Sequence, residues 1–259
     1  MKKVLKFVSE NILFLFTLFL LIFIPLYPKL PIIDVTNTWV YVRAEDFIIA
    51  GVLTLWIFLI LIKKVKLKTP LTLPIFLFWA IGAISTFHGV LILFPTLSNV
   101  FPNVAFLSFL RRVEYMSLFF IAFAGVKDKK FIYHVIWVLA IVLVLIVLYG
   151  LGQKFYGFPA FLTGNEEFSK GIALKVSSLG RIPSTFAGHY DLAAYLVLLI
   201  PIFVSLAFGF RKWITKVLLL IVSVMGFGLL FMTVSRVSFF VLLISLFALL
   251  ILHRKKFLI

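Results

Sequence analysis

Two arginines lie at the ends of apolar runs, where a cation could bind an anion. Arg236 ends the short polar stretch Thr233–Arg236 between two such runs, and Arg181 opens a polar segment that leads into another run. A charge at mid-membrane depth costs about 2.5–3.5 kcal/mol, and less near the interface. Arg236 is therefore either a turn residue whose side chain snorkels to the interface or a fixed cation that faces an anionic headgroup.

The segment that begins at Arg181 carries further polar groups. Ser184 and Thr185, with the backbone N–H groups of the helix that follows, could help Arg181 to bind an oxyanion. The alternative is an arginine solvated in a loop. His189 starts the next apolar run, as an interfacial residue or as a base. The sequence has no metal-binding cluster, P-loop or dinucleotide-binding glycine pattern, so we expect neither a metal nor a cofactor.

The composition requires a membrane. Of 259 residues, 64% are apolar and the mean hydropathy is +1.22, whereas soluble domains are about 45–50% apolar. A soluble enzyme, a secreted module and a disordered protein are excluded. The net charge of +16 would suggest nucleic acid in a soluble protein. Here the basic residues form short clusters between apolar runs, as topology signals do, and we expect no nucleic-acid partner. The absence of cysteine excludes disulfides and thiolate sites.

Eight apolar segments are long enough to be spans. Inside a bilayer the backbone groups must pair within each segment, so each is predicted to be a helix. The fold class is then all-α: one polytopic transmembrane domain over residues 1–259, with the polar stretch 152–189 as an outer loop. The predicted spans are about 11–27, 47–62, 71–90, 106–125, 131–151, 190–210, 217–233 and 237–252.

The basic residues predict the orientation of these spans. With both termini in the cytoplasm, the inner segments hold sixteen of the 25 basic residues and only two of the nine acidic ones, which obeys the positive-inside rule. The sixteen are Lys2, Lys3, Lys6, Lys63, Lys64, Lys66, Lys68, Lys127, Lys129, Lys130, Arg211, Lys212, Lys216, Arg254, Lys255 and Lys256.

Several acidic residues stand where a helix begins. Glu45 and Asp46 precede the second span and Asp191 begins the sixth, positions at which a carboxylate favours the helix dipole. Arg111 and Glu114 are three residues apart near the outer end of the fourth span, so we expect them to share a helix face and to pair.

Three patterns together resemble the O-antigen ligase and O-antigen polymerase-like family. An Arg-x-x-x-Thr-Phe segment is matched by Arg181–Phe186, a polar group before Leu-Ala-x-Tyr-Leu by His189–Leu196, and a Thr-x-Ser-Arg turn by Thr233–Arg236. Two further patches also look similar: Pro25–Lys29 with Val42–Phe47, and Arg111–Tyr115. The likeness therefore covers residues 25 to 240 in patches.

The resemblance implies an inverting glycosyltransferase with a GT-C-like membrane region, in the cytoplasmic membrane. Such an enzyme moves a glycan from a polyprenyl diphosphate carrier to a lipid or glycan acceptor at the outer face. Arg236 and Arg181 match the positions that stabilise the diphosphate leaving group, which arginines can do without a metal. Ser235, Thr185, His189 and Arg111 are expected to contact the substrate.

The chain departs from this family in one respect. Family members carry more spans and a His-Asn pair in a large outer loop, whose histidine is the proposed base, and no His-Asn pair occurs here. We therefore expect this chain to be an N-terminal part of a longer protein. Without a general base its rate of glycan transfer would be about 10²–10⁴-fold lower, unless His189 replaces that base. Two other functions stay open: a transporter or flippase of lipid-linked sugars, and a non-catalytic assembly subunit.

Overall fold

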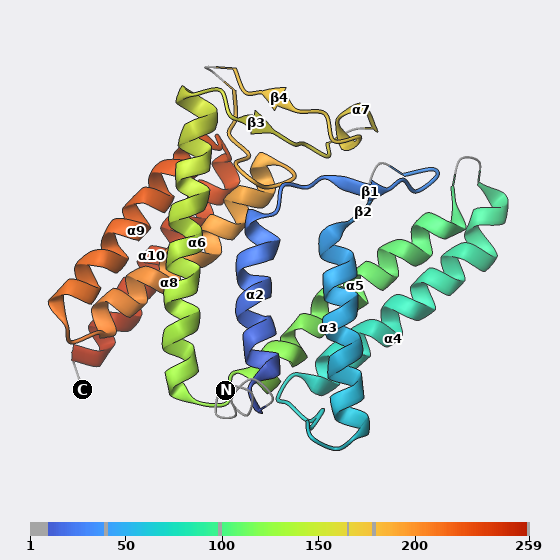
Figure 1. Ribbon diagram of the computed structural model, residues 1–259, viewed down its shortest axis with the longest axis horizontal. Coiled ribbons are helices and arrows are strands. Elements are labelled where there is room, and N and C mark those ends of the chain that lie inside the picture. The colour runs from blue at the N-terminus through green and yellow to red at the C-terminus, as the bar shows by residue number, and fades with distance from the viewer. Residues whose placement is uncertain (1–9, 39–40, 98–99, 165, 178–179, 258–259) are drawn as a thin grey trace, which may run out of the picture. The chain divides into compact units, whose positions relative to one another are not determined.

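The chain folds mainly into helices (Figure 1). The computed structural model describes residues 10–38, 41–97, 100–164, 166–177 and 180–257. The α-helices are α2 (Ile12–Leu26), α3 (Ala44–Leu61), α4 (Thr72–His88), α5 (Pro102–Gly125), α6 (Lys129–Phe155), α7 (Glu166–Ser169), α8 (His189–Gly209), α9 (Trp213–Met232) and α10 (Arg236–Phe257).

Each of the eight predicted spans coincides with one of the longer helices. Six of these helices are long and apolar enough to cross a membrane: α3, α4 with its continuation to Thr96, α6, α8, α9 and α10. The remaining two are α2, which has 15 residues, and α5, which carries Arg111, Arg112 and Glu114. An all-α, multi-pass membrane bundle is thus confirmed, whereas the number of eight spans stays a prediction.

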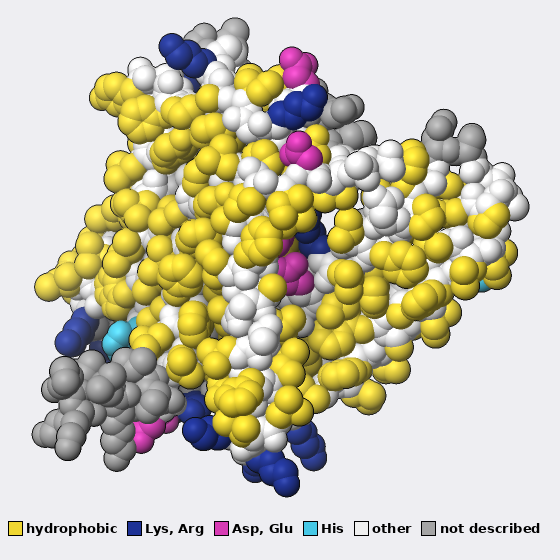
Figure 2. Space-filling model, turned by 45° about the vertical axis from the view of Figure 1, so that its right-hand side comes forward, with side chains coloured by type: hydrophobic (Ala, Val, Ile, Leu, Met, Phe, Trp, Pro, Cys, Tyr) yellow, Lys and Arg dark blue, Asp and Glu magenta, His cyan; other side chains and the backbone are white. Residues whose placement is uncertain are grey.

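The surface is that of a membrane protein. Many large apolar side chains on the predicted spans are exposed, among them Leu61 at 73%, Phe231 at 72% and Ile244 at 67%. Apolar side chains cover most of the face drawn in Figure 2. Monomeric soluble proteins rarely expose contiguous apolar patches of more than a few hundred Å², so lipid is the solvent that this surface fits.

The chain divides into two compact units. Unit 1 comprises residues 1–21 and 32–135, and unit 2 comprises residues 22–31 and 136–259. Both α2 and α6 cross the boundary and contribute residues to each unit. The prediction of a single transmembrane domain stays a prediction.

Unit 1 is built on α5, which packs against α3 and α4; α4 and α5 run side by side in Figure 1. The indole of Trp56 stacks on the ring of Phe120 at 5.6 Å between centroids. Gly125 lets α5 end against α2, because a Cβ at this position would lie 2.9 Å from the backbone nitrogen of Phe14. The strands β1 (Pro31–Ile33) and β2 (Val42–Arg43) pair in a two-stranded sheet before α3.

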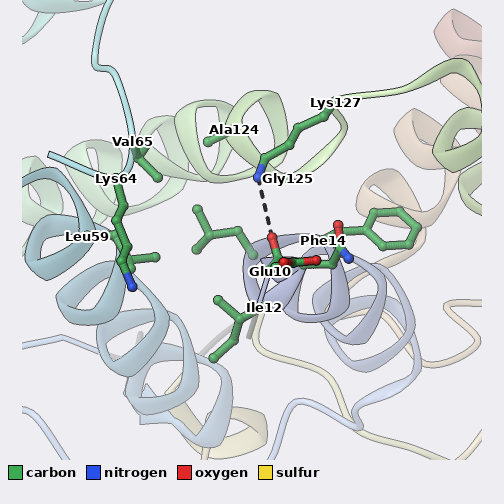
Figure 3. A pocket seen from close by; sticks show the side chains of 11 residues that line it. Glu10, Ile12, Phe14, Leu59, Lys64, Val65, Ala124, Gly125 and Lys127 are labelled. Atoms are coloured by element: carbon green, nitrogen blue, oxygen red, sulfur yellow. Dashed lines mark hydrogen bonds between the residues drawn. The ribbon is translucent and has the colours of Figure 1, made fainter. Parts of the chain in front are cut away.

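Three segments predicted to face the cytoplasm converge in unit 1. Glu10 before α2, Lys64 after α3 and Lys127 after α5 line one cavity of about 260 Å³. The Nζ of Lys127 donates to the backbone oxygen of Glu10 at 3.3 Å (Figure 3). These segments therefore lie at the same end of unit 1, as alternating spans require.

Unit 2 is a tightly packed group in which α8 contacts both α9 and α10. Its core includes Leu143, Leu196, Phe203 and Leu219, none of which is exposed. Small residues allow the close packing that helices in lipid depend on. A Cβ at Gly226 would lie 3.3 Å from side-chain atoms of α6 and α8.

The connection between α6 and α8 is shorter than the predicted outer loop 152–189. Helix α6 continues to Phe155, so the connection to α8 is residues 156–188. It contains α7 and the antiparallel pair β3 (Pro159–Ala160) and β4 (Leu174–Lys175). Strands of two residues have no detectable periodicity, which is why the sequence did not reveal them. Figure 1 shows these elements at the end of unit 2 where α6 ends and α8 begins.

Candidate functional site

Part of the polar segment between Arg181 and His189, from Ile182 to Thr185, forms a buried strip in unit 2. Residues 182–185 are all buried, and the N–H of Ile182 donates to the backbone oxygen of Met232 at 3.2 Å. This bond joins the Arg181 segment directly to the end of α9, where the Arg236 turn begins. The two arginine-bearing segments that the sequence singled out are therefore neighbours.

Gln153 fixes the middle of this strip. Its side-chain amide accepts a hydrogen bond from the N–H of Ser184 at 2.9 Å and donates to the oxygen of Ser184 at 2.9 Å. It also donates to the oxygen of Pro159 at 3.0 Å. The Ser184 hydroxyl donates to the oxygen of Ile146 at 2.7 Å. Ser184 has a positive φ of 52°, a strained conformation for a residue with a Cβ, and these bonds hold it there.

Gln153 was not among the predicted site residues. Its signal in the sequence is a single amide beside a long apolar run, at a position predicted to start the outer loop. An amide that is 1% exposed must find partners, because leaving its polar atoms unpaired would cost about 1–3 kcal/mol each.

Thr185 was expected to contact the substrate, and its hydroxyl is already engaged within the fold. The side chain is 9% exposed, and its Oγ1 donates to the backbone oxygen of Pro25 at 2.6 Å. The neighbouring oxygen of Ile24 accepts from the Nζ of Lys29 at 2.7 Å. Thr185 and Lys29 together pair carbonyl groups at the end of α2, which have no partner inside the helix.

Arg181 comes just before the strip and His189 starts α8, and their side chains are in contact. The Nη1 of Arg181 lies 3.1 Å from the Nε2 of His189. A guanidinium only donates, so Nε2 is the acceptor and the imidazole proton is on Nδ1. Arg181 is exposed and His189 half-buried. The guanidinium of Arg181 is therefore oriented by a neutral imidazole while it stays exposed to a ligand.

The turn between α9 and α10 is equally well defined. The Thr233 hydroxyl is buried and donates to the oxygen of Leu230 at 2.7 Å, and the N–H of Ser235 donates to the Thr233 Oγ1 at 3.3 Å. Val234 has a φ of 57°. The hydroxyl groups of Ser235 and Ser238 are 2.8 Å apart. This network leaves Arg236 exposed as the first residue of α10.

A groove of about 320 Å³ lies beside Arg236. Apart from Arg236 and Ser235 it is lined by apolar side chains of α9, the turn and α10. A cation next to an apolar groove suits an amphiphile that has an anionic head and an apolar tail. The lining residues are Leu230, Phe231, Val234, Ser235, Arg236, Phe239 and Phe240.

Arg111 lies in unit 1, whereas the other five predicted site residues lie in unit 2. The predicted pair with Glu114 does not form. The Nη2 of Arg111 instead binds the Oδ2 of Asp46 at 3.0 Å and donates to the oxygen of Tyr41 at 3.3 Å. Asp46 is a better partner because its Oδ2 also accepts the N–H of Arg43 at 2.8 Å and is fixed at the start of α3.

The predicted helix-start positions of the acidic residues are confirmed. Glu45 and Asp46 lie in the first turn of α3, and Asp191 lies in the first turn of α8. Within the described parts of the chain, no group of three or more His, Asp or Glu side chains is arranged to hold a metal ion. The groups described near Arg181 and Arg236 are hydroxyls, the imidazole of His189 and, two residues further on, the carboxylate of Asp191.

Comparison of the chain with known protein families, curated proteins and solved structures finds no match.

Proposed function

We propose that this protein binds the diphosphate of a polyprenyl-linked glycan through Arg181 and Arg236. In this proposal the protein then transfers the glycan to a lipid or glycan acceptor at the outer face of the cytoplasmic membrane. This is the activity of an O-antigen ligase or polymerase. The observation that carries the proposal is the hydrogen bond from the N–H of Ile182 to the oxygen of Met232, because it joins the segments that bear the two cations.

The chemistry requires cations more than an acid. In the transfer, the bond between the anomeric carbon and the diphosphate oxygen breaks, and the diphosphate keeps the electron pair. A bond to the acceptor hydroxyl oxygen forms, and the hydroxyl proton leaves to a base. Guanidinium groups stabilise the growing negative charge at the diphosphate through several donors each. His189, whose Nε2 accepts from Arg181, orients one of these cations.

The apolar groove beside Arg236 supports a donor with a lipid tail. A water-soluble sugar nucleotide has no tail to fill such a groove, whereas a polyprenyl chain buries apolar surface there. Ser235 lines this groove beside Arg236, and we infer that its hydroxyl contacts the bound headgroup. Thr185, by contrast, acts by holding the Arg181 segment through the oxygen of Pro25.

The test measures binding of undecaprenyl diphosphate to the full chain in nanodiscs, with Arg181→Ala and Arg236→Ala as variants. Each variant is expected to bind at least about tenfold more weakly, because a charge-assisted hydrogen bond contributes about 1.5–3 kcal/mol. Lys175→Ala is the matched control, since Lys175 is an exposed cation of the same connection outside the proposed site. An equal loss of affinity for undecaprenyl diphosphate in all three variants, or normal binding in both arginine variants, would contradict the proposal.

A second assay separates transfer from transport. Vesicles that contain the protein and a polyprenyl diphosphate-linked glycan are analysed for a new glycosidic bond and for movement of the donor across the bilayer. Transfer predicts bond formation that is lost in Arg236→Ala. Movement without a new bond would assign the site to a transporter, and binding with neither outcome would assign it to an assembly subunit.

A further inference from the structure

A second polar cavity lies in unit 1, apart from the residues of the proposed function. It has a volume of about 410 Å³ between the start of α3 and the first half of α5. Asp46, Arg111, Arg112 and Glu114 line it, together with Tyr115 and apolar side chains. A cavity that carries both signs of charge among apolar walls is unusual for a region that faces lipid, because each buried charge needs a partner.

Two of these groups pair with each other and two do not. Arg111 is bound to Asp46 at 3.0 Å. The Oε1 of Glu114 is buried and has no hydrogen-bond partner within the described ranges, and the same is true of the Oδ1 of Asp46. Arg112 is exposed, and the described residues offer it no ion-pair partner. The cavity thus presents one unpaired cation and carboxylate oxygens that lack donors.

The cavity lies beside the N-terminal end of α3. Asp46 is the third residue of α3, a helix that is long and apolar enough to span the membrane. Its contact with Arg111 places the first half of α5 at the polar end of α3. The exposed side chains of Leu107 and Leu110, which also line the cavity, are adjacent to the charged groups. A ligand there has a charged head and an apolar part.

We propose that this cavity binds the headgroup of a zwitterionic phospholipid with a primary ammonium, such as phosphatidylethanolamine. The phosphate binds the guanidinium of Arg112, and the ammonium donates to Glu114. The proposal commits to a lipid because charge complementarity requires both signs on one molecule, and because exposed apolar side chains line the cavity beside the start of the apolar helix α3.

The number of donors on the ligand decides which zwitterion fits. A primary ammonium carries three N–H donors. It can therefore donate hydrogen bonds to the oxygens of Glu114 and Asp46 that have no donor among the described residues. The trimethylammonium of phosphatidylcholine has the same charge and no N–H donor. Phosphatidylglycerol carries the phosphate without the cation. Comparison of these three lipids therefore tests the hydrogen bonds separately from the charge.

The experiment measures lipids that stay bound to the purified full chain by native mass spectrometry, after exposure to equimolar phosphatidylethanolamine, phosphatidylcholine and phosphatidylglycerol. We expect about a tenfold preference for phosphatidylethanolamine over phosphatidylcholine. Glu114→Gln should abolish this preference, and Arg112→Gln should weaken the binding of all three lipids. Asp34→Asn is the control, because Asp34 is an exposed acid before α3 that does not line the cavity.

Each outcome decides the proposal. Loss of the preference in Glu114→Gln with retention in Asp34→Asn supports it. Equal binding of the three lipids by the original protein, or a preference that survives in Glu114→Gln, overturns it. Soluble phosphoethanolamine is the final arm: competition at concentrations equal to those of the lipid would mean a soluble ligand and would overturn the lipid assignment. Arg112 is exposed, so Arg112→Gln provides a reading even if Glu114→Gln impairs folding.

Discussion

The strip from Ile182 to Thr185 in unit 2 and the charged cavity in unit 1 handle buried polar groups in opposite ways. In the strip, Gln153 satisfies the N–H and the oxygen of Ser184 within the protein. In the cavity, Glu114 and Asp46 keep buried oxygens that have no donor among the described residues. A satisfied network fixes a backbone, whereas unsatisfied acceptors favour a ligand that brings donors. The strip is therefore a support for a site, and the cavity is itself a site.

The largest effect is expected where the satisfied network is broken. Gln153→Leu leaves the N–H and the oxygen of Ser184 buried without partners, which should lower the free energy of unfolding by about 3 kcal/mol or more, at about 1–3 kcal/mol for each group. Denaturation in mixed micelles measures this. Gln153→Glu is the graded comparison, because its carboxylate still accepts from the N–H. A loss of stability no greater than about 0.5 kcal/mol in Gln153→Leu would mean that the network does not support the strip.

A larger side chain beside the strip tests how tightly the strip is packed, without removing a hydrogen bond. A Cβ at Gly150 would lie 2.7 Å from Leu229 Cδ1 and 3.3 Å from Ile182 Cγ2. Gly150→Leu should therefore destabilise the protein by about 1–3 kcal/mol and raise hydrogen exchange at the Ile182 amide. Gly228→Leu is the control, since no atom lies within 4 Å of a Cβ there. Similar losses in both variants would point to a general effect of leucine in place of glycine.

Thr185 allows a finer test of the strip. Thr185→Val keeps the shape and removes the donor to the oxygen of Pro25, so a loss of about 1 kcal/mol is expected in the free energy of unfolding. Thr54→Val is matched, because among the described residues the Thr54 hydroxyl bonds only to the oxygen of Ala50 in its own exposed helix turn. It should cost less than about 0.5 kcal/mol. If Thr185→Val costs no more than this control, its hydroxyl is free to serve a ligand.

The positions of the helices along the chain could be predicted from the sequence, because hydropathy acts over whole segments. The partners of individual side chains could not. Arg111 was assigned to Glu114 by a local spacing rule, while its partner Asp46 is 65 residues away. Likewise, Gln153 was assigned to a loop because the apolar run ends before it, although α6 continues to Phe155. Local rules do not contain such tertiary contacts.

The smallest effect, and one of the opposite sign, is expected in the charged cavity. Glu114→Gln removes a charge that is partly desolvated and has an oxygen without a donor. Because burying an unpaired charge costs free energy that the neutral amide avoids in part, the free energy of unfolding should be unchanged or rise by up to about 1 kcal/mol. The measurement is made in micelles without phosphatidylethanolamine and repeated with it. Added lipid should stabilise the original protein more than Glu114→Gln, since a ligand stabilises the folded state in proportion to how tightly that state binds it. A loss of stability in lipid-free micelles comparable to that of Gln153→Leu would mean that Glu114 is as much a part of the framework as Gln153, and the contrast between the two regions would fail.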